Sequence, residues 1–148
     1  MNAALVIGRE GSQGFPGKNL YPVLGRSLAA YPLMAARQAT KVGAVFMSTD
    51  SDRLKALARE HGAEVIERPP ELATPQALGE DAFRHGFMVI RERLRARGHT
   101  LDSLALLFCN SATINAATLD AAIAKIDADP DIDSVVTVSR YNMWSPLR

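Results

Sequence analysis

The amino-acid sequence predicts an α/β fold in which helices cover both faces of a mostly parallel β-sheet. Short apolar runs rich in branched residues alternate along the 148 residues with segments whose apolar positions recur at helical spacing. Strands that alternate with helices form βαβ units, and the helices of such units bury both faces of the sheet. Hydrophobic residues make up 47% of the chain and charged residues 22%, a balance typical of a globular domain.

The strands are predicted from five short apolar runs. They cover residues 3–7, 44–48, 63–66, 103–108 and 134–138. Each run is too short for a helix and is bounded by glycine, proline or polar residues, which favours a strand. The third run is closed by Pro69 and Pro70, and the fifth, SVVTV, is rich in β-branched residues.

The first two helices have clear boundaries in the sequence. Residues 28–40 (LAAYPLMAARQAT) form the first, with Pro32 tolerable only in the opening turn. The second follows the second strand, where Asp50 or Ser51 is expected to cap its N-terminus and Gly62 to end it.

Two further helices follow from apolar stripes. Phe83, Phe87, Ile90 and Leu94 lie at i, i+4, i+7 and i+11, which predicts one apolar face of a long helix. The arginines between them predict a solvated opposite face rather than a nucleic-acid site. Leu119, Ile123 and Ile126 repeat the pattern in a shorter helix.

Composition narrows the class of protein. Seventeen basic residues against sixteen acidic ones give a net charge of +1, which argues against a nucleic-acid coat protein. Cys109 is the only cysteine, so no internal disulfide forms and an intracellular location is favoured. The apolar stretch in the opening MNAALVIGRE is too short for a signal peptide. No apolar run in the sequence is long enough to span a membrane. We therefore expect a soluble, cytoplasmic protein that binds neither membrane nor nucleic acid.

The loop after the first strand carries the strongest chemical signal. Residues 8–19 read GREGSQGFPGKN, with a glycine at every third position from Gly8 to Gly17. Bare backbone with access to positive φ lets amide groups converge on a ligand, and Arg9 and Lys18 add fixed positive charge. Ligands of such sheets bind beyond the carboxyl ends of the strands, which is where this loop begins. The loop is predicted to cradle phosphates.

Two common phosphate loops do not fit. A Walker A loop needs glycine where Ser12 stands and a serine or threonine where Asn19 stands. The dinucleotide fingerprint G-x-G-x-x-G needs a glycine at position 10, which is Glu10. Kinase-like and dehydrogenase-like interpretations are therefore excluded.

A third pattern does fit. The loop IGREGSQGFPGKN resembles the A-R-x-G-S-K-G-x-P-x-K-N loop of the acylneuraminate cytidylyltransferases, the CMP-sialic acid synthetase family. The resemblance continues through SLAAYPLMAA, MSTDS and RPPELA to the ending SVVTVSRYNMWSPLR. It implies a three-layer Rossmann-like sandwich of the nucleotide-diphospho-sugar transferase type. Residues 1–148 are then expected to be the nucleotide-binding part of a nucleotidyltransferase domain whose C-terminal part is missing.

The same resemblance implies an activity, the transfer of CMP from CTP to a sialic acid-like 2-keto acid sugar with release of pyrophosphate. Arg9 and Lys18 are the implied catalytic residues, which hold the triphosphate. The implied nucleotide-binding residues are Gly8, Arg9, Gly11, Ser12, Gly14, Lys18, Asn19 and Arg68. Asn19 is expected at the nucleotide's sugar or base, and Arg68 at the carbonyl edge of cytosine. The family also implies Mg²⁺, with ligands beyond residue 148, and a homodimeric parent protein.

Several positions depart from the family pattern. Gln13 replaces a lysine of the loop, Phe108 replaces a glutamine that contacts cytosine in many relatives, and Gly79 falls near a serine used for base or ribose contact. These departures leave two alternatives open: a non-catalytic nucleotide- or sugar-binding module, or a transferase for another sugar acid or pyrimidine nucleotide. A triphosphate carries about four negative charges and Arg9 with Lys18 offset about two, so we expect the chain alone to be inactive in transfer.

Other chemically suggestive residues have simpler interpretations. Asp50 is interpreted as a helix cap rather than a catalyst, and Cys109 as a buried structural thiol. Arg68 has the alternative of an ion pair with Glu71, and Ser12 that of ordinary turn chemistry. The three histidines lack metal-ligand spacing, and the aspartates of residues 127–133 lack the glycine and glutamate of a calcium loop. No metal ligand is assigned in this chain.

Overall fold

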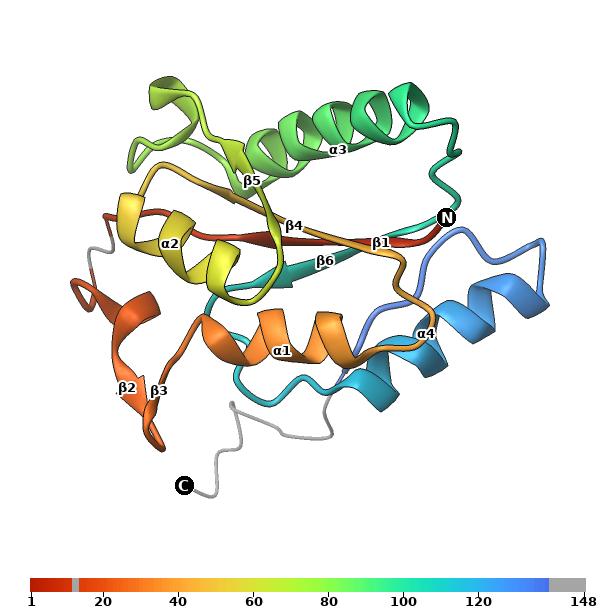
Figure 1. The fold of residues 1–148 in the computed structure, drawn as a ribbon, viewed down its shortest axis with the longest axis horizontal. Coiled ribbons are helices and arrows are strands. Elements are labelled where there is room, and N and C mark those ends of the chain that lie inside the picture. The colour runs from red at the N-terminus through yellow and green to blue at the C-terminus, as the bar shows by residue number, and fades with distance from the viewer. Residues whose placement is uncertain (12–13, 139–148) are drawn as a thin grey trace, which may run out of the picture.

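The computed structural model describes residues 1–11 and 14–138, so that the expectations for Ser12, Gln13 and the end of the chain from residue 139 lie outside the described residues. In the described part, four parallel strands form one sheet in the order β5-β4-β1-β6 (Figure 1). These strands are β1 (Ala3–Ile7), β4 (Ala44–Thr49), β5 (Glu64–Glu67) and β6 (Leu104–Phe108). A small antiparallel hairpin, β2 (Pro22–Val23) with β3 (Arg26–Ser27), lies outside this sheet.

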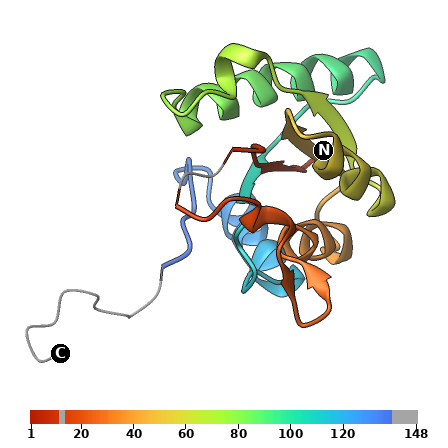
Figure 2. The same ribbon diagram turned by 90° about the vertical axis from the view of Figure 1, so that its left-hand side faces the viewer.

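Helices cover both faces of the sheet, which confirms the predicted layers (Figures 1 and 2). The long helix α3 (Gly79–Ala96) lies on one face. The other face carries α1 (Ala30–Gln38), α2 (Asp52–Glu60) and α4 (Ala116–Ala128). Two short 3-10 turns, η1 (Lys18–Leu20) and η2 (Pro70–Leu72), follow β1 and β5.

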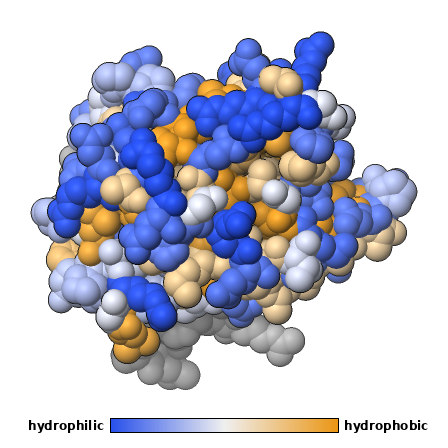
Figure 3. Space-filling view, viewed as in Figure 1, coloured by the Kyte–Doolittle hydropathy of each residue, from blue (hydrophilic) through white to orange (hydrophobic). Residues whose placement is uncertain are grey.

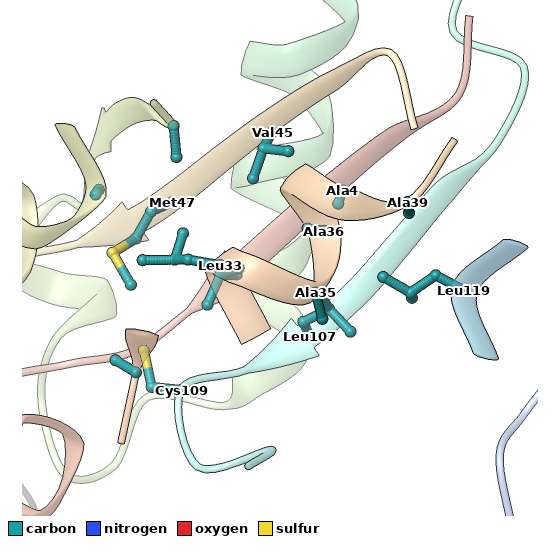
Figure 4. Packing of buried hydrophobic residues seen from close by; sticks show 14 of the residues in the cluster. Ala4, Leu33, Ala35, Ala36, Ala39, Val45, Met47, Leu107, Cys109 and Leu119 are labelled. Carbon is teal, nitrogen blue, oxygen red and sulfur yellow. The ribbon is translucent and has the colours of Figure 1, made fainter. Parts of the chain in front are cut away.

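The residues of β1 divide the core into two clusters. Ala4 and Val6 pack with α1, α2 and α4, whereas Leu5 and Ile7 pack against the α3 side. This alternation follows from the two-residue period of a strand, and both sets are apolar because both faces are covered. Figure 4 shows the first cluster, in which Leu33 of α1 lies over the sheet and Leu119 of α4 closes one side.

The buried face of α3 differs from the predicted stripe. Its fully buried positions are Ala82, Gly86, Ile90 and Leu94, which lie four residues apart. A Cβ atom at Gly86 would lie 2.5 Å from Cδ2 of Leu5, so the helix backbone rests directly on β1. Ile90 and Leu94 are buried as predicted. Phe83 and Phe87 of the predicted stripe are only partly buried, because the close approach of α3 to β1 selects small residues in the first half of the helix.

The arginines of residues 84–97 are exposed, as predicted, except for Arg93, which is partly buried. Figure 3 shows strongly hydrophilic residues over this part of the surface, but two arginines reach back to β5. Arg97 binds both carboxylate oxygens of Glu64, one at 2.8 Å, and Arg93 donates to the carbonyl oxygen of Val65 at 3.0 Å. These contacts fasten the C-terminal half of α3 to the edge of the sheet.

The helix caps settle one alternative left open by the sequence. The side chain of Ser51, not that of Asp50, caps α2 by accepting a hydrogen bond from the amide of Leu54. The predicted cap role of Asp50 is therefore wrong, since its carboxylate accepts from the amide of Glu10 instead. Gly62 ends α2 at a φ of 69°, as predicted.

The predicted fifth strand is not formed. Residues 134–138 belong to no strand and pair with no other strand among the described residues, and the side chains of Val136 and Val138 are 77% and 89% exposed. β-branched composition favours a strand only where a neighbour accepts its backbone hydrogen bonds. Within the described residues, no segment pairs with the outer edge of β6, and the sheet ends there.

The strand order creates a crevice at one point of the sheet. From β1 the chain moves outward through β4 to β5, and α3 then returns it to β6 on the other side of β1. The direction of winding therefore reverses between β1 and β6. In open α/β sheets, ligands bind at such a switch point, outside the carboxyl ends of the strands.

Replacing Gly86 by valine is expected to destabilise the fold by about 1–3 kcal/mol, because the new side chain must displace Leu5 or lift α3 from β1. Urea unfolding followed by circular dichroism measures the change. The matched control is Gly79→Val in the same helix, where a Cβ meets no atom within 4 Å. Equal midpoints for the two variants would contradict the close contact.

The pairing of Glu64 with Arg97 is expected to make stability depend on pH. The bound guanidinium lowers the pKa of Glu64 below its ordinary value, so the pair stabilises the fold above the ordinary glutamate pKa. This stabilisation is lost as the pH falls through the lowered folded-state pKa. Glu64→Gln should therefore lower the urea midpoint slightly at pH 7 and have little effect in acid. Glu60→Gln, on the exposed surface of α2, is the control, and an equal loss at both pH values would refute the pairing.

Candidate functional site

A cleft of about 240 Å³ opens at the switch point between β1 and β6. Its walls come from four segments: the loop after β1, the end of β5, the segment 72–82 that leads into α3, and the end of β6. Six of the residues predicted for nucleotide binding line it: Gly8, Arg9, Gly11, Lys18, Asn19 and Arg68. Gly14 is exposed and does not line this cleft, and Ser12 lies outside the described residues. The structure thus gathers residues that the sequence separates by up to 60 positions.

Gly8 allows the loops after β1 and β6 to touch. A Cβ atom at this position would lie 2.2 Å from Sγ of Cys109 and 3.4 Å from Nδ2 of Asn19. The amide of Gly8 donates to the carbonyl oxygen of Ser48, and the amide of Cys109 donates to that of Ile7. Only a residue without a side chain fits between these groups, so the floor of the cleft is largely backbone.

Asn19 holds the glycine loop in its folded path. Its side chain is almost fully buried and donates from Nδ2 to the carbonyl oxygen of Arg9 at 3.2 Å. Its own carbonyl oxygen accepts from the amide of Ala29 at 2.8 Å. The turn just before it is made by Gly17, which has a φ of 73°. Asn19 therefore has a clear structural role beside its position in the cleft.

Arg9 connects the glycine loop to the segment that follows η2. Its Nη1 atom donates to the carbonyl oxygen of Thr74 at 2.7 Å. The next amide along the loop, that of Glu10, donates to Oδ1 of Asp50 at 3.0 Å. Neither Thr74 nor Asp50 was predicted to hold this loop, because such contacts join segments 40 to 65 residues apart.

Arg68 is buried beneath the cleft and held by the sheet. It donates from Nε to Oγ of Ser48 at 3.4 Å and from Nη2 to the carbonyl oxygen of Ser48 at 2.7 Å. In the described residues it forms no ion pair with Glu71, so that alternative is not supported. Burial lowers the pKa of Arg68, and the nearby Asp50 opposes this shift, but a guanidinium stays charged at neutral pH.

Cys109 is a structural thiol. Its side chain is 2% exposed, and burial raises its pKa to about 12 although Arg68 and Lys18 nearby act in the opposite direction. The thiolate that a nucleophile requires is therefore scarce at neutral pH, as the sequence led us to expect. Lys18 and Arg68 line the same cleft as Cys109, which follows β6. With Arg9 they surround the cleft with positive charge.

Within residues 1–11 and 14–138, no group of three or more histidine, cysteine or acidic side chains is placed to hold a metal ion.

Among the same residues, no helix combines the length and apolar character needed to cross a membrane.

Comparison with known proteins identifies the family. The model of the family described as Cytidylyltransferase matches residues 3–94, more than half of the chain, from β1 to the end of α3. N-acylneuraminate cytidylyltransferase of Escherichia coli O18:K1:H7 is 29% identical over 144 residues, which are 97% of this chain and 32% of that protein. The 8-amino-3,8-dideoxy-manno-octulosonate cytidylyltransferase of Shewanella woodyi is 35% identical over 84 residues, 56% of this chain and 34% of that protein.

A solved structure supports the fold. A CMP:2-keto-3-deoxy-manno-octonic acid synthetase complexed with CTP superposes with a TM-score of 0.68 at 19% identity, covering 88% of this chain and 49% of that one. The present chain spans about a third of the length of the two curated relatives. On the match of the family model, which contains both the glycine loop and Arg68, the chain belongs to the cytidylyltransferase family.

Proposed function

We propose that residues 1–148 form the nucleotide-binding part of an enzyme that transfers CMP from CTP to a sialic acid-like 2-keto acid sugar and releases pyrophosphate. The observation that carries this proposal is the convergence of Arg9, Lys18 and Arg68 on a cleft at the switch point of the sheet. A cleft lined by one sign of charge concentrates anions, and a nucleoside triphosphate carries about four negative charges. The relatives named for transfer of cytidylyl groups to sugar acids support the choice of nucleotide and acceptor.

The two ends of the cleft suit the two ends of a nucleotide. Arg9 and Lys18 flank the glycine loop, and we assign them to the phosphate oxygens. Among the described residues, Thr74 accepts from Nη1 of Arg9, and the other N–H groups of this guanidinium are the proposed donors. Arg68 is more deeply buried, and the donors that Ser48 does not occupy are the ones we assign to a pyrimidine carbonyl.

The proposed reaction needs no covalent bond between protein and substrate, and the protein contributes by positioning the reactants and offsetting charge. In the proposed reaction the anomeric hydroxyl oxygen of the sugar attacks the α-phosphorus in line, and the bond from that phosphorus to the bridging oxygen of pyrophosphate breaks. Arg9 and Lys18 offset the charge that builds on the leaving pyrophosphate. Holding both reactants in line can contribute about 7–11 kcal/mol to lowering the barrier. We further propose that the Mg²⁺ ligands lie beyond residue 148 and that the complete protein is a homodimer.

Arg9→Ala and Lys18→Ala are each expected to weaken CTP binding about tenfold, because each removes one cation from the triphosphate. Isothermal titration calorimetry of the chain with CTP measures the dissociation constants. Arg59→Ala and Lys125→Ala remove the same charges from exposed surface outside the cleft and serve as matched controls. Absence of nucleotide binding, or equal losses in controls and site variants, would overturn the proposal.

A further inference from the structure

An unusual feature of the cleft is its exposed apolar rim. Phe108, the last residue of β6, is 48% exposed, and Leu78, just before α3, is 59% exposed. Both line the same cleft, although they come from different segments. Large apolar side chains left open to water inside a ligand cleft are typical of surfaces that a ligand covers.

The polar side chains of the cleft are mostly committed elsewhere. The side chain of Asn19 donates to the backbone of Arg9, and Arg9 and Lys18 flank the phosphate loop. At the start of α3, Gly79 brings no side chain, and a Cβ there would meet no atom within 4 Å. Among the described residues of the lining, the side-chain amide of Asn110 is the remaining polar side chain besides Arg68.

Arg68 offers little discrimination between pyrimidines. A guanidinium only donates hydrogen bonds, and cytosine and uracil both carry an acceptor carbonyl at C2. Telling the 4-amino group of cytosine from the 4-oxo group of uracil requires an acceptor or donor on that edge of the ring. Neither Phe108 nor Gly79 can supply one from its side chain. Stacking on an aromatic ring, by contrast, accepts any base, because every base has a π-face.

We infer that Phe108 is the stacking platform for the nucleobase, with Leu78 completing the apolar rim, so that this site holds pyrimidine nucleotides as a class rather than cytidine nucleotides alone. This inference rests on the proposed function, since it concerns the base end of the same nucleotide site. UTP should bind within about tenfold of CTP. Stacking on Phe108 should contribute about tenfold to the affinity for both.

The test compares CTP, UTP and inorganic tripolyphosphate by titration calorimetry. Phe108→Ala should weaken both nucleotides about tenfold and leave tripolyphosphate unchanged, because the latter has no base to stack. Phe108→Leu keeps an apolar side chain without a π-face and should behave like the alanine variant. Phe108→Trp should retain or improve binding. Thermal melting of each variant shows whether it remains folded, and the leucine and tryptophan variants preserve the test if Phe108→Ala does not fold.

A reciprocal variant tests the selectivity. Phe108→Gln with Gly79→Ser adds a donor–acceptor amide and a hydroxyl to the base end, and the open space at residue 79 admits the serine. The double variant should favour one pyrimidine over the other by at least tenfold more than the wild type. Asn110→Ala tests the remaining side-chain amide of the lining, and the inference expects the ratio of CTP to UTP affinities to stay the same in this variant. Gln38→Ala, on the exposed surface of α1, is the control outside the cleft.

The outcomes separate this inference from the proposed function. If CTP binds and Phe108→Ala or Phe108→Leu binds it as tightly as the wild type, stacking is refuted while nucleotide binding stands. If the wild type prefers CTP over UTP by a hundredfold or more, or if Asn110→Ala abolishes a preference, the assignment of base selection is overturned. If neither nucleotide binds, the proposed function fails together with the inference.

Discussion

The close approach of the loops after β1 and β6 is the contact on which the site depends. Gly8 leaves room for Sγ of Cys109 and for the side chain of Asn19, and backbone hydrogen bonds on either side fix the two loops in place. A side chain at residue 8 would separate the segments that carry Phe108 from those that carry Arg9. The contact between these two loops is therefore made mainly by backbone atoms. It fixes the positions of the loops, and these in turn position the charged side chains around the cleft.

Much of the sheet was predictable because its signal is local. The strands of the described sheet have apolar centres, as expected of strands covered on both faces, and each was placed within a residue or so of its observed position. The failure at residues 134–138 arose because a strand also needs a partner, which composition does not report. The face of α3 was misjudged for a related reason. The pattern weighs apolar size, whereas contact with β1 selected Gly86 and Ala82.

The site also contains residues that local sequence motifs predict and contacts that depend on the tertiary fold. Arg9, Lys18, Asn19 and Arg68 were predicted from short motifs, and the structure brings them to one cleft. The contacts that hold this region were missed, because they form only through the tertiary fold. Thr74 binds Arg9, Ser48 binds Arg68, and Asp50 binds the amide of Glu10. Leu78 was missed for lack of any signal, since a lone leucine before a helix has no distinctive chemistry. The ion pair proposed between Arg68 and Glu71 was a sequence-local idea that a long-range contact with Ser48 displaced.

The hydrogen bond from Arg9 to Thr74 has a consequence for the thermodynamics of recognition. A long, freely rotating side chain gives up roughly 2 kcal/mol of rotamer entropy when a ligand immobilises it. Here the guanidinium is oriented by a carbonyl oxygen before any anion arrives, so part of that loss belongs to folding and not to association. Arg9 thereby joins the loop after β1 to the segment after η2, and the phosphate proposed as its ligand would meet a guanidinium whose orientation is already fixed.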